Sequence, residues 1–423
     1  MATSVPVTKP TSTTPILDLE QPLPRRNSWK RWVGWTAWIV FILVLPVITE
    51  AGQQLPVLGG VFQVLDIVAK TFFGTMLSPA SASFVWSVAL IWLALYGALV
   101  IHELGHVIAG LAVRFRPNFV IIFPFRFTRT RTGWAVQRER LTTLSGAASM
   151  LPPDSHRLRT RLIIFVLGGP AANFLTFLIL RPWLPNLAQA PNTAIFFFES
   201  LANMSLFLGA ANLLPFQARG FQSDGARFLM AVAKEQRFRR WFALVRLSTA
   251  IASGTRARDL DTALIGQALE FEDRSGDSMR ANLIAYSWAA DRDEIAGAAG
   301  YLERCLAYAS KLPNRTRSFL MLEAAVFQGW YREDATRAVK WFDFAGKSRR
   351  RFPALYRLRP EIAVLWAEGR HTEAQAKLQE AIAAVQKMPA NATRDLLELS
   401  MSEWQQKMRS RLEARQASAA AES

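Results

Sequence analysis

Long apolar runs dominate the first half of the chain, up to about Gly225, whereas the second half is charged and favours helices. A helix needs about 20 apolar residues to cross a bilayer, and the second half contains no such run. The first half contains four runs that predict crossings, at residues 32–48, 84–113, 162–180 and 194–214. A further apolar stretch, residues 55–77, is interrupted by glycines and charged residues, which predicts an interfacial or re-entrant helix. The pattern therefore predicts a mainly α protein in which a polytopic membrane helical bundle of about four transmembrane helices precedes a soluble half.

The segment between the second and third runs favours β-structure. Residues 118–137 are rich in β-branched and aromatic side chains and contain a turn signal at Thr132-Gly133, which predicts a membrane-associated β-hairpin. The surrounding loop, residues 114–161, carries ten arginines and two acidic residues. Because positively charged loops remain on the cytoplasmic side, we expect this loop and both chain termini to be cytoplasmic.

The soluble half contains a weak internal repeat with a spacing of 39 residues. Each unit has the pattern of a helix, a turn and a second helix, with small residues at positions where neighbouring helices would pack closely. This pattern resembles a tetratricopeptide-type repeat and predicts an α-solenoid, although the spacing exceeds the usual 34 residues. The matching positions are Ala285, Ala324 and Ala363; Trp288, Phe327 and Trp366; and Ala296, Ala335 and Ala374.

Composition divides the chain into five parts. A disordered cytoplasmic N-terminus at residues 1–30 precedes the transmembrane domain at residues 31–225. Basic juxtamembrane linker helices at residues 226–275 lead to the helical repeat domain at residues 276–412. The low-complexity tail at residues 413–423 is expected to be disordered.

Charge and cysteine usage narrow the function classes. The net charge of +17 comes from basic residues that concentrate beside apolar runs, where they indicate membrane orientation and anionic lipid rather than a nucleic-acid partner. Cys305 is the single cysteine, which excludes an intrachain disulfide and a multi-cysteine metal site. We therefore expect a lipid bilayer as a partner and no nucleic acid.

Candidate chemistry is concentrated in His102-Glu103-Leu104-Gly105-His106, near the end of the second apolar run. Four residues make about one helical turn, so His102 and His106 lie on nearly one face and could bind one metal ion. This is the H-E-x-x-H pattern of zinc hydrolases, in which the glutamate acts as general base on zinc-bound water. Ionisable residues inside an apolar span are also candidates for function by default.

A catalytic zinc site usually has three protein ligands and one open position, so a third ligand is expected from elsewhere in the chain. Asp224 has suitable chemistry and lies on the expected cytoplasmic side, just after the last apolar run. Its alternative interpretation is a helix N-cap before Ala226. Other candidates for the third ligand are Asp154, His156 and Glu199.

Three motifs in three successive apolar runs resemble the site-2 protease family of intramembrane zinc metalloproteases. The resemblance covers residues 84–230 and consists of His102, Glu103 and His106, then Gly169, Pro170 and Asn173, and finally Asn212, Pro215, Asp224 and Gly225. The family's usual form places Leu-Asp-Gly closer to the proline. In this chain nine positions separate Pro215 from Asp224, and Ser223 replaces the leucine.

The resemblance implies Zn²⁺ bound by His102, His106 and Asp224, with Glu103 as general base. It also implies that Asn173 and Asn212 hold the substrate or the oxyanion, although Asn173 could instead be an interhelical amide that stabilises a kink. The expected activity is hydrolysis of peptide bonds in or near transmembrane segments of membrane protein substrates. The implied location is a bacterial inner membrane.

Two further expectations concern recognition. A substrate strand could pair with residues 118–127 through main-chain hydrogen bonds. The repeat domain could recruit a cytosolic protein partner. The competing function is a catalytically inactive zinc-binding membrane scaffold that recruits such partners through its helical repeats.

Overall fold

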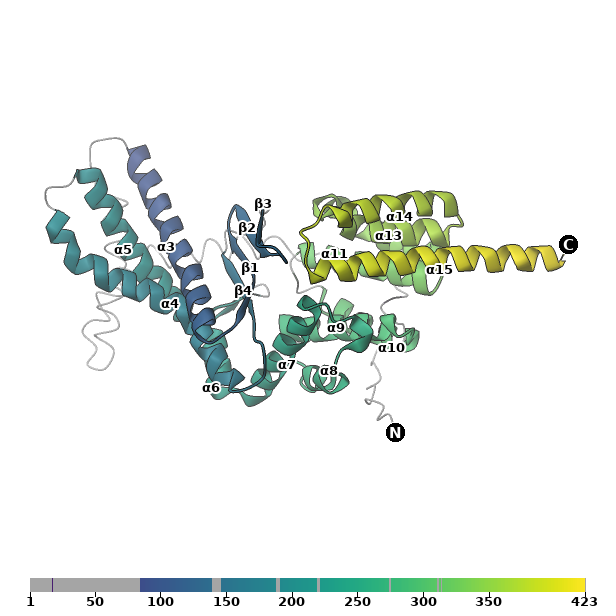
Figure 1. Ribbon diagram of the computed structural model, residues 1–423, viewed down its shortest axis with the longest axis horizontal. Helices are drawn as coiled ribbons and strands as arrows, with labels where there is room; N and C mark the ends of the chain where they lie inside the picture. Colours follow the sequence, from purple (N-terminus) through teal and green to yellow (C-terminus); the bar gives the residue numbers. More distant parts are fainter. Residues whose placement is uncertain are drawn as a thin grey trace.

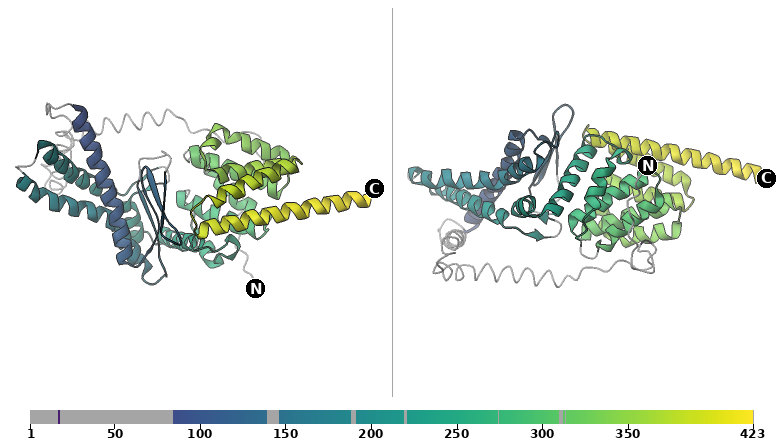
Figure 2. Two further views of the ribbon diagram at one scale, coloured as in Figure 1. Left: turned by 45° about the horizontal axis from the view of Figure 1, so that its top comes forward. Right: turned by 90° about the horizontal axis from the view of Figure 1, so that it is seen from below.

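The computed structural model describes residues 17, 84–138, 146–187, 191–218, 221–273, 275–309, 312 and 314–422. The expected crossing at 32–48 and the interfacial stretch at 55–77 lie outside these residues, as does the N-terminal lead apart from Leu17. The described part is mainly helical with a small antiparallel sheet, as the hydrophobic pattern predicts. The sheet lies between three apolar helices and the helices of the C-terminal half (Figures 1 and 2).

Three helices of the described chain are long and apolar enough to cross a membrane. They are α3 (Phe84–Ala112), α4 (Leu158–Trp183) and α5 (Asn192–Leu213), and each packs against the other two. Glycines bring α3 and α4 together, because a Cβ on Gly105 would lie 2.4 Å from the carbonyl oxygen of Gly168. The close helix approach expected from small residues is therefore present at this pair.

The β-region is larger than the predicted hairpin. Strands β1 (Arg116–Ile122), β2 (Phe125–Arg129), β3 (Trp134–Arg138) and β4 (Ala147–Leu151) form an antiparallel sheet in the order β3-β2-β1-β4. The expected turn joins β2 to β3, where the amide of Thr130 donates to the carbonyl of Gly133 at 2.9 Å. The short strand β4 adds to the other side of β1, so β1 is interior and the strands at the edges are β3 and β4.

Short elements connect the apolar helices to the C-terminal half. A two-stranded ribbon, β5 (Gln217–Ala218) and β6 (Phe221–Gln222), precedes α6 (Asp224–Ala233), α7 (Glu235–Ala252) and α8 (Thr262–Leu269). Residues 226–275 are largely helical, and Arg240 of α7 is buried. Its guanidinium donates to the carbonyl of Phe271 and pairs with Asp273, so this arginine stabilises the fold rather than facing a lipid surface.

The C-terminal half is a succession of packed helices. Its elements are α9 (Gly276–Asp291), α10 (Ile295–Ala307), α11 (Asn314–Val326), a π-helical turn (Phe327–Tyr331), α12 (Ala335–Phe344), α13 (Ala354–Ala367), α14 (His371–Gln386) and α15 (Ala392–Glu422). Consecutive helices pack against each other, and Ala285, Ala324 and Ala363 are all fully buried at equivalent places in α9, α11 and α13. The equivalence fails for Ala296, which is exposed, whereas Ala374 is buried.

Two segments expected to be disordered contain ordered residues. The tail from residue 413 continues α15 as far as Glu422, because it is rich in alanine, the residue with the highest helix propensity. Figure 1 shows this helix projecting beyond its neighbours. In the N-terminal lead, Leu17 is fully buried among the helices of the C-terminal half.

Candidate metal centre

The two histidines of α3 face the interior of the three-helix packing. His102 and His106 are 4% and 7% exposed, and their ring centroids are 4.8 Å apart. The spacing of four residues brings their Nε2 atoms to 3.2 Å from each other. The helix periodicity predicted from the sequence therefore places two potential metal ligands side by side.

The ribbon and the start of α6 deliver Asp224 to these histidines. The side chain of Ser223 caps α6 by accepting a hydrogen bond from the amide of Ala226, and it also donates to the carbonyl of Leu214 at 2.6 Å. Ser223, not Asp224, is therefore the N-cap, which leaves the Asp224 carboxylate free to face α3. A Cβ on Gly225 would lie 1.8 Å from the carbonyl oxygen of Leu213, so only glycine fits this close return of the chain.

His102, His106 and Asp224 form a compact group of donor atoms. Oδ2 of Asp224 lies 3.1 Å from Nε2 of His102 and 3.4 Å from Nε2 of His106. All the candidate ligand atoms lie within 4.8 Å of one another, and the group could hold a metal ion. The ribbon of β5 and β6 thus accommodates the longer connection from Pro215 without separating Asp224 from the histidines.

The other candidates for a third ligand have different partners. Asp154 pairs with Arg161 at 2.7 Å and accepts a hydrogen bond from the amide of His156. Glu199 lies 3.8 Å from Arg181. Within the described ranges, the acid that joins the histidines is Asp224.

The electrostatics of Asp224 suit a ligand carboxylate. Burial by itself would raise the pKa of Asp224, but hydrogen bonds from His102 and His106 lower this pKa to about 2. Hydrogen bonds to the charged form stabilise it, so the carboxylate is ionised at neutral pH.

Hydrogen bonds at the far side of each imidazole orient the histidines. Nδ1 of His106 lies 2.8 Å from the carbonyl oxygen of Phe165, an acceptor that requires a proton on Nδ1. Nδ1 of His102 lies 3.4 Å from the side-chain amide of Asn173, which is fully buried. Both contacts leave the Nε2 atoms directed toward Asp224, and the carbonyl of Phe165 contacts His106 in the way that outer acceptors orient metal-binding histidines.

Gly169 of α4 provides the space beside the Nε2 atoms. A Cβ at this position would lie 2.5 Å from Nε2 of His106 and 2.8 Å from Nε2 of His102. The bare backbone of Gly169 is therefore part of the wall of the site. This glycine belongs to the second motif in the sequence, but its steric role depends on the rotation of α4 about its axis, which the motif does not specify.

Glu103 lies next to the histidines and against the sheet. Its carboxylate accepts a hydrogen bond from the backbone of Ala148 in β4, and its Oε2 atom is buried without a hydrogen-bond partner among the described residues. A Cβ on Gly146 would lie 2.2 Å from Oε1 of Glu103. The start of β4 therefore sets the position of this carboxylate. The sequence does not predict this contact, because β4 is short and has little β-propensity.

The second asparagine expected at the site has a different environment. The side-chain amide of Asn212 donates to the carbonyl of Leu208 in its own helix at 3.1 Å. Of the two asparagines, the structure thus brings Asn173 into contact with the histidine group. Asn212 remains a candidate for substrate binding on sequence grounds alone.

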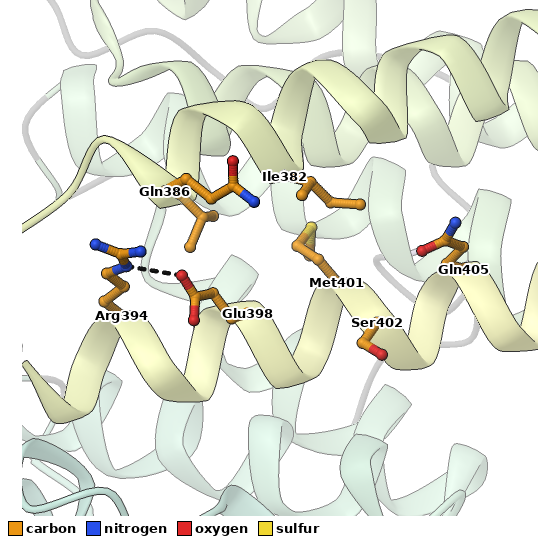
Figure 3. Close-up of a pocket in the computed structure, with 8 residues that line it drawn as sticks. Ile382, Gln386, Arg394, Glu398, Met401, Ser402 and Gln405 are labelled. Carbon is orange, nitrogen blue, oxygen red and sulfur yellow. Dashed lines mark hydrogen bonds and ion pairs between the residues drawn. The ribbon is translucent and has the colours of Figure 1, made fainter. Parts of the chain in front are cut away.

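A pocket of about 490 Å³ lies away from this centre, between α14 and α15 (Figure 3). Arg394 and Glu398 form an ion pair at 2.7 Å at one end of it. Its lining contains a single carboxylate and no histidine, so it does not offer a metal site comparable to that of α3 and α6.

Comparisons with protein-family models, curated proteins and solved structures found no match to this chain.

Proposed function

We propose that this protein is an intramembrane zinc metalloprotease that hydrolyses peptide bonds in or near transmembrane segments of other membrane proteins. The observation that carries the proposal is the convergence of His102, His106 and Asp224 beside Glu103, at helices long enough to cross a membrane. Burying ionisable groups in such helices costs free energy, so these groups usually mark a functional site.

The spacing of the ligand atoms supports zinc. Zinc binds histidine and carboxylate ligands at about 2.0–2.2 Å in a tetrahedral arrangement, which separates neighbouring ligand atoms by roughly 3.3 Å. The observed separations among His102 Nε2, His106 Nε2 and Asp224 Oδ2 are 3.1, 3.2 and 3.4 Å. Three protein ligands would leave one position open, as in catalytic rather than structural zinc sites.

Glu103 would act as the general base. A bound zinc ion would supply Lewis acidity toward a carbonyl oxygen and would make a water more acidic. Glu103 would accept a proton from the attacking water and return it to the leaving amine, which balances the hydrolysis. Asn173 would hold His102 in orientation, and Asn212 would contribute to substrate binding.

Edge strand β4 is the better candidate for pairing with an extended substrate. The expected pairing region, residues 118–127, falls in β1 and β2, and each of these strands already has a partner on both sides. Strand β4 pairs on one side only within the described sheet and contacts Glu103 through Ala148. A substrate strand added to β4 would therefore reach the site close to the proposed base.

We propose a multi-pass position in the bacterial inner membrane with both termini cytoplasmic. Support for a membrane position comes from large apolar side chains that α3 and α4 expose, including Trp92, Ile108 and Leu178. Exposed apolar side chains of this kind are expected where lipid covers a helix. The packed helices α9 to α15 would form the tetratricopeptide-like solenoid and bind a cytosolic protein partner.

The test is a cleavage assay in liposomes with candidate single-span membrane proteins. The Glu103→Gln protein should retain one zinc per chain and lose cleavage, whereas His102→Ala and Asp224→Ala should lose the metal as well. Elemental analysis of each purified variant separates the two effects. Zinc binding without cleavage by the wild type would favour the inactive scaffold, and equal cleavage by wild type and Glu103→Gln would contradict Glu103 as the general base.

A further inference from the structure

Leu17 of the N-terminal segment lies inside the helical C-terminal half. Its side chain is fully buried and belongs to the same apolar cluster as Leu302, Leu306 and Phe327. Leu17 is separated from these residues by nearly three hundred positions of sequence, including all three apolar helices. The contact therefore joins the start of the chain to its C-terminal half.

The carbonyl oxygen of Leu17 is held by two side chains. It accepts hydrogen bonds from Nε2 of Gln328 and from Nε1 of Trp341, each at 2.9 Å. Both donors are almost completely inaccessible to solvent, at 0% and 1% exposure. Two buried donors that converge on one main-chain carbonyl form a specific recognition site, because each would be unsatisfied if the carbonyl were absent.

The backbone around Gln328 is unusual. Gln328 lies in the π-helical turn Phe327–Tyr331, which directly follows α11 and ends that helix. Such turns are rare and frequently occur at functional sites. In addition, Oε1 of Gln328 is buried without a hydrogen-bond partner in the described part of the chain, so it could accept a main-chain N–H from a bound peptide.

We propose that the C-terminal helices contain a peptide-binding site for a leucine side chain and its main-chain carbonyl, and that Leu17 of the same chain occupies it. The apolar cluster to which Leu302, Leu306 and Phe327 belong receives the side chain, and Gln328 and Trp341 bind the carbonyl. A protein partner that presents the same chemistry competes with Leu17. The site is independent of the proposed proteolytic activity.

Linkage to the same chain gives the internal segment a high effective concentration, so the free wild-type site is scarce. Replacement of Leu17 by a charged residue removes the apolar contact and leaves the binding residues unchanged. The probe is a fluorescein-labelled peptide of residues 11–23, and its binding to the full-length purified chain is measured by fluorescence anisotropy. We expect the peptide to bind Leu17→Asp protein at least about tenfold more tightly than wild type.

Two double variants test the recognition of the carbonyl. Adding Trp341→Phe to Leu17→Asp removes one hydrogen bond and should weaken peptide binding by about tenfold. The matched control is Trp288→Phe in the same background, because the indole N–H of Trp288 has no hydrogen-bond partner among the described residues. This control should bind the peptide as the Leu17→Asp protein does.

Three outcomes would overturn the proposal. The first is a folded Leu17→Asp protein that does not bind the peptide, and the second is equal weakening by Trp341→Phe and Trp288→Phe. The third is unfolding of the C-terminal helices, seen by circular dichroism, in both Leu17→Asp and the milder Leu17→Ala variant. That result would make Leu17 a permanent part of the core rather than an exchangeable ligand.

Discussion

Nδ1 of His106 lies 2.8 Å from the carbonyl oxygen of Phe165, so a backbone acceptor on α4 orients a histidine on α3. Because that carbonyl can only accept, Nδ1 donates to it, and Nε2 is the ring nitrogen that faces Asp224. The same Nε2 atom lies 3.4 Å from Oδ2 of Asp224. The packing of α3 against α4 thus prepares His106 as a ligand before any ion binds.

Asn173 should affect metal affinity through His102. Its amide contacts Nδ1 of His102, so Asn173→Ala removes the group that orients this imidazole. Loss of an outer partner of a metal ligand typically weakens metal binding by about 10–100-fold. Competition with a zinc chelator measures the affinity of the purified protein.

The matched control for Asn173 is Asn212→Ala on α5. The side-chain amide of Asn212 donates to the carbonyl of Leu208 and not to a histidine, so Asn212→Ala should retain the wild-type metal affinity. If both variants bound zinc as tightly as wild type, the orienting role of Asn173 would be wrong. A selective loss of cleavage in Asn173→Ala would instead support contact with the substrate.

Gly169→Ala should prevent metal binding while leaving the helices in place. The added methyl group would lie 2.5 Å from Nε2 of His106, in the space that an ion needs. Because the methyl group would be attached directly to the backbone of α4 and would contact both histidines, rotation of one side chain could not relieve the clash. Elemental analysis should find less than one zinc per ten chains, since the methyl group blocks the ligand atoms.

Gly97→Ala on α3 is the control for Gly169→Ala. Its added methyl group would meet Cδ1 of Leu201 at 3.2 Å, the mobile end of a flexible side chain. This variant should therefore bind zinc as wild type does. Full zinc occupancy in Gly169→Ala would show that the metal lies elsewhere.

The sequence predicted the parts of this site that depend on local periodicity and on the order of the helices. His102 and His106 face one side because they are one helical turn apart, and Asp224 follows the last apolar run on the expected side. The contacts of Phe165 and Asn173 depend on how far α4 is rotated against α3. No local pattern in a single sequence specifies that rotation.

Strand β4 and α15 show two other limits of the sequence pattern. Strand β4 consists of small and mixed residues, Ala147 to Leu151, and forms because β1 offers it an edge. The tail after residue 413 has a low-complexity composition that indicates disorder, yet the same residues have high helix propensity and extend α15. Tertiary pairing decides the first case and local propensity decides the second.

Arg240→Ala should destabilise the C-terminal half. The side chain of Arg240 is 2% exposed and pairs with that of Asp273, which is 9% exposed, so the variant leaves Asp273 with the more exposed Arg237 as its remaining ion-pair partner among the described residues. Breaking a buried pair costs about 3–5 kcal/mol of the free energy of unfolding when the other charge is left uncompensated, so with Arg237 in place we expect a loss near the lower end of that range. Urea unfolding followed by tryptophan fluorescence measures the loss.

The neighbouring Arg239→Ala is the control for Arg240→Ala. Arg239 and Glu270 form an ion pair whose side chains are 50% and 55% exposed, so its loss should cost at most about 1 kcal/mol. Equal losses in the two variants would contradict the structural role of Arg240.

Asp273 gives the same region a pH dependence. Burial acts to raise the pKa of Asp273, but hydrogen bonds from Arg240 and Ser275 bring this pKa below its usual value. A lowered folded-state pKa adds stability above the unfolded-state pKa, and the added stability disappears as the pH falls through the folded-state pKa. The difference in unfolding free energy between wild type and Arg240→Ala should therefore shrink below about pH 4.

Gly146→Ala should separate cleavage from metal binding. Its methyl group would lie 2.2 Å from Oε1 of Glu103, so either the carboxylate or the start of β4 must move. A displacement of about 1 Å at a catalytic group can lower a rate about 100-fold. The ligands His102, His106 and Asp224 lie outside this contact, so zinc content should remain at the wild-type level.

Gly133→Ala is the control for Gly146→Ala, because Gly133 lies in the β2–β3 turn of the same sheet and a Cβ there would meet nothing within 4 Å. We expect this variant to cleave the substrate at the wild-type rate in the liposome assay. Unchanged cleavage in Gly146→Ala would mean that catalysis does not depend on the position of Glu103 against β4. The proposal that β4 presents the substrate beside Glu103 would then also be wrong.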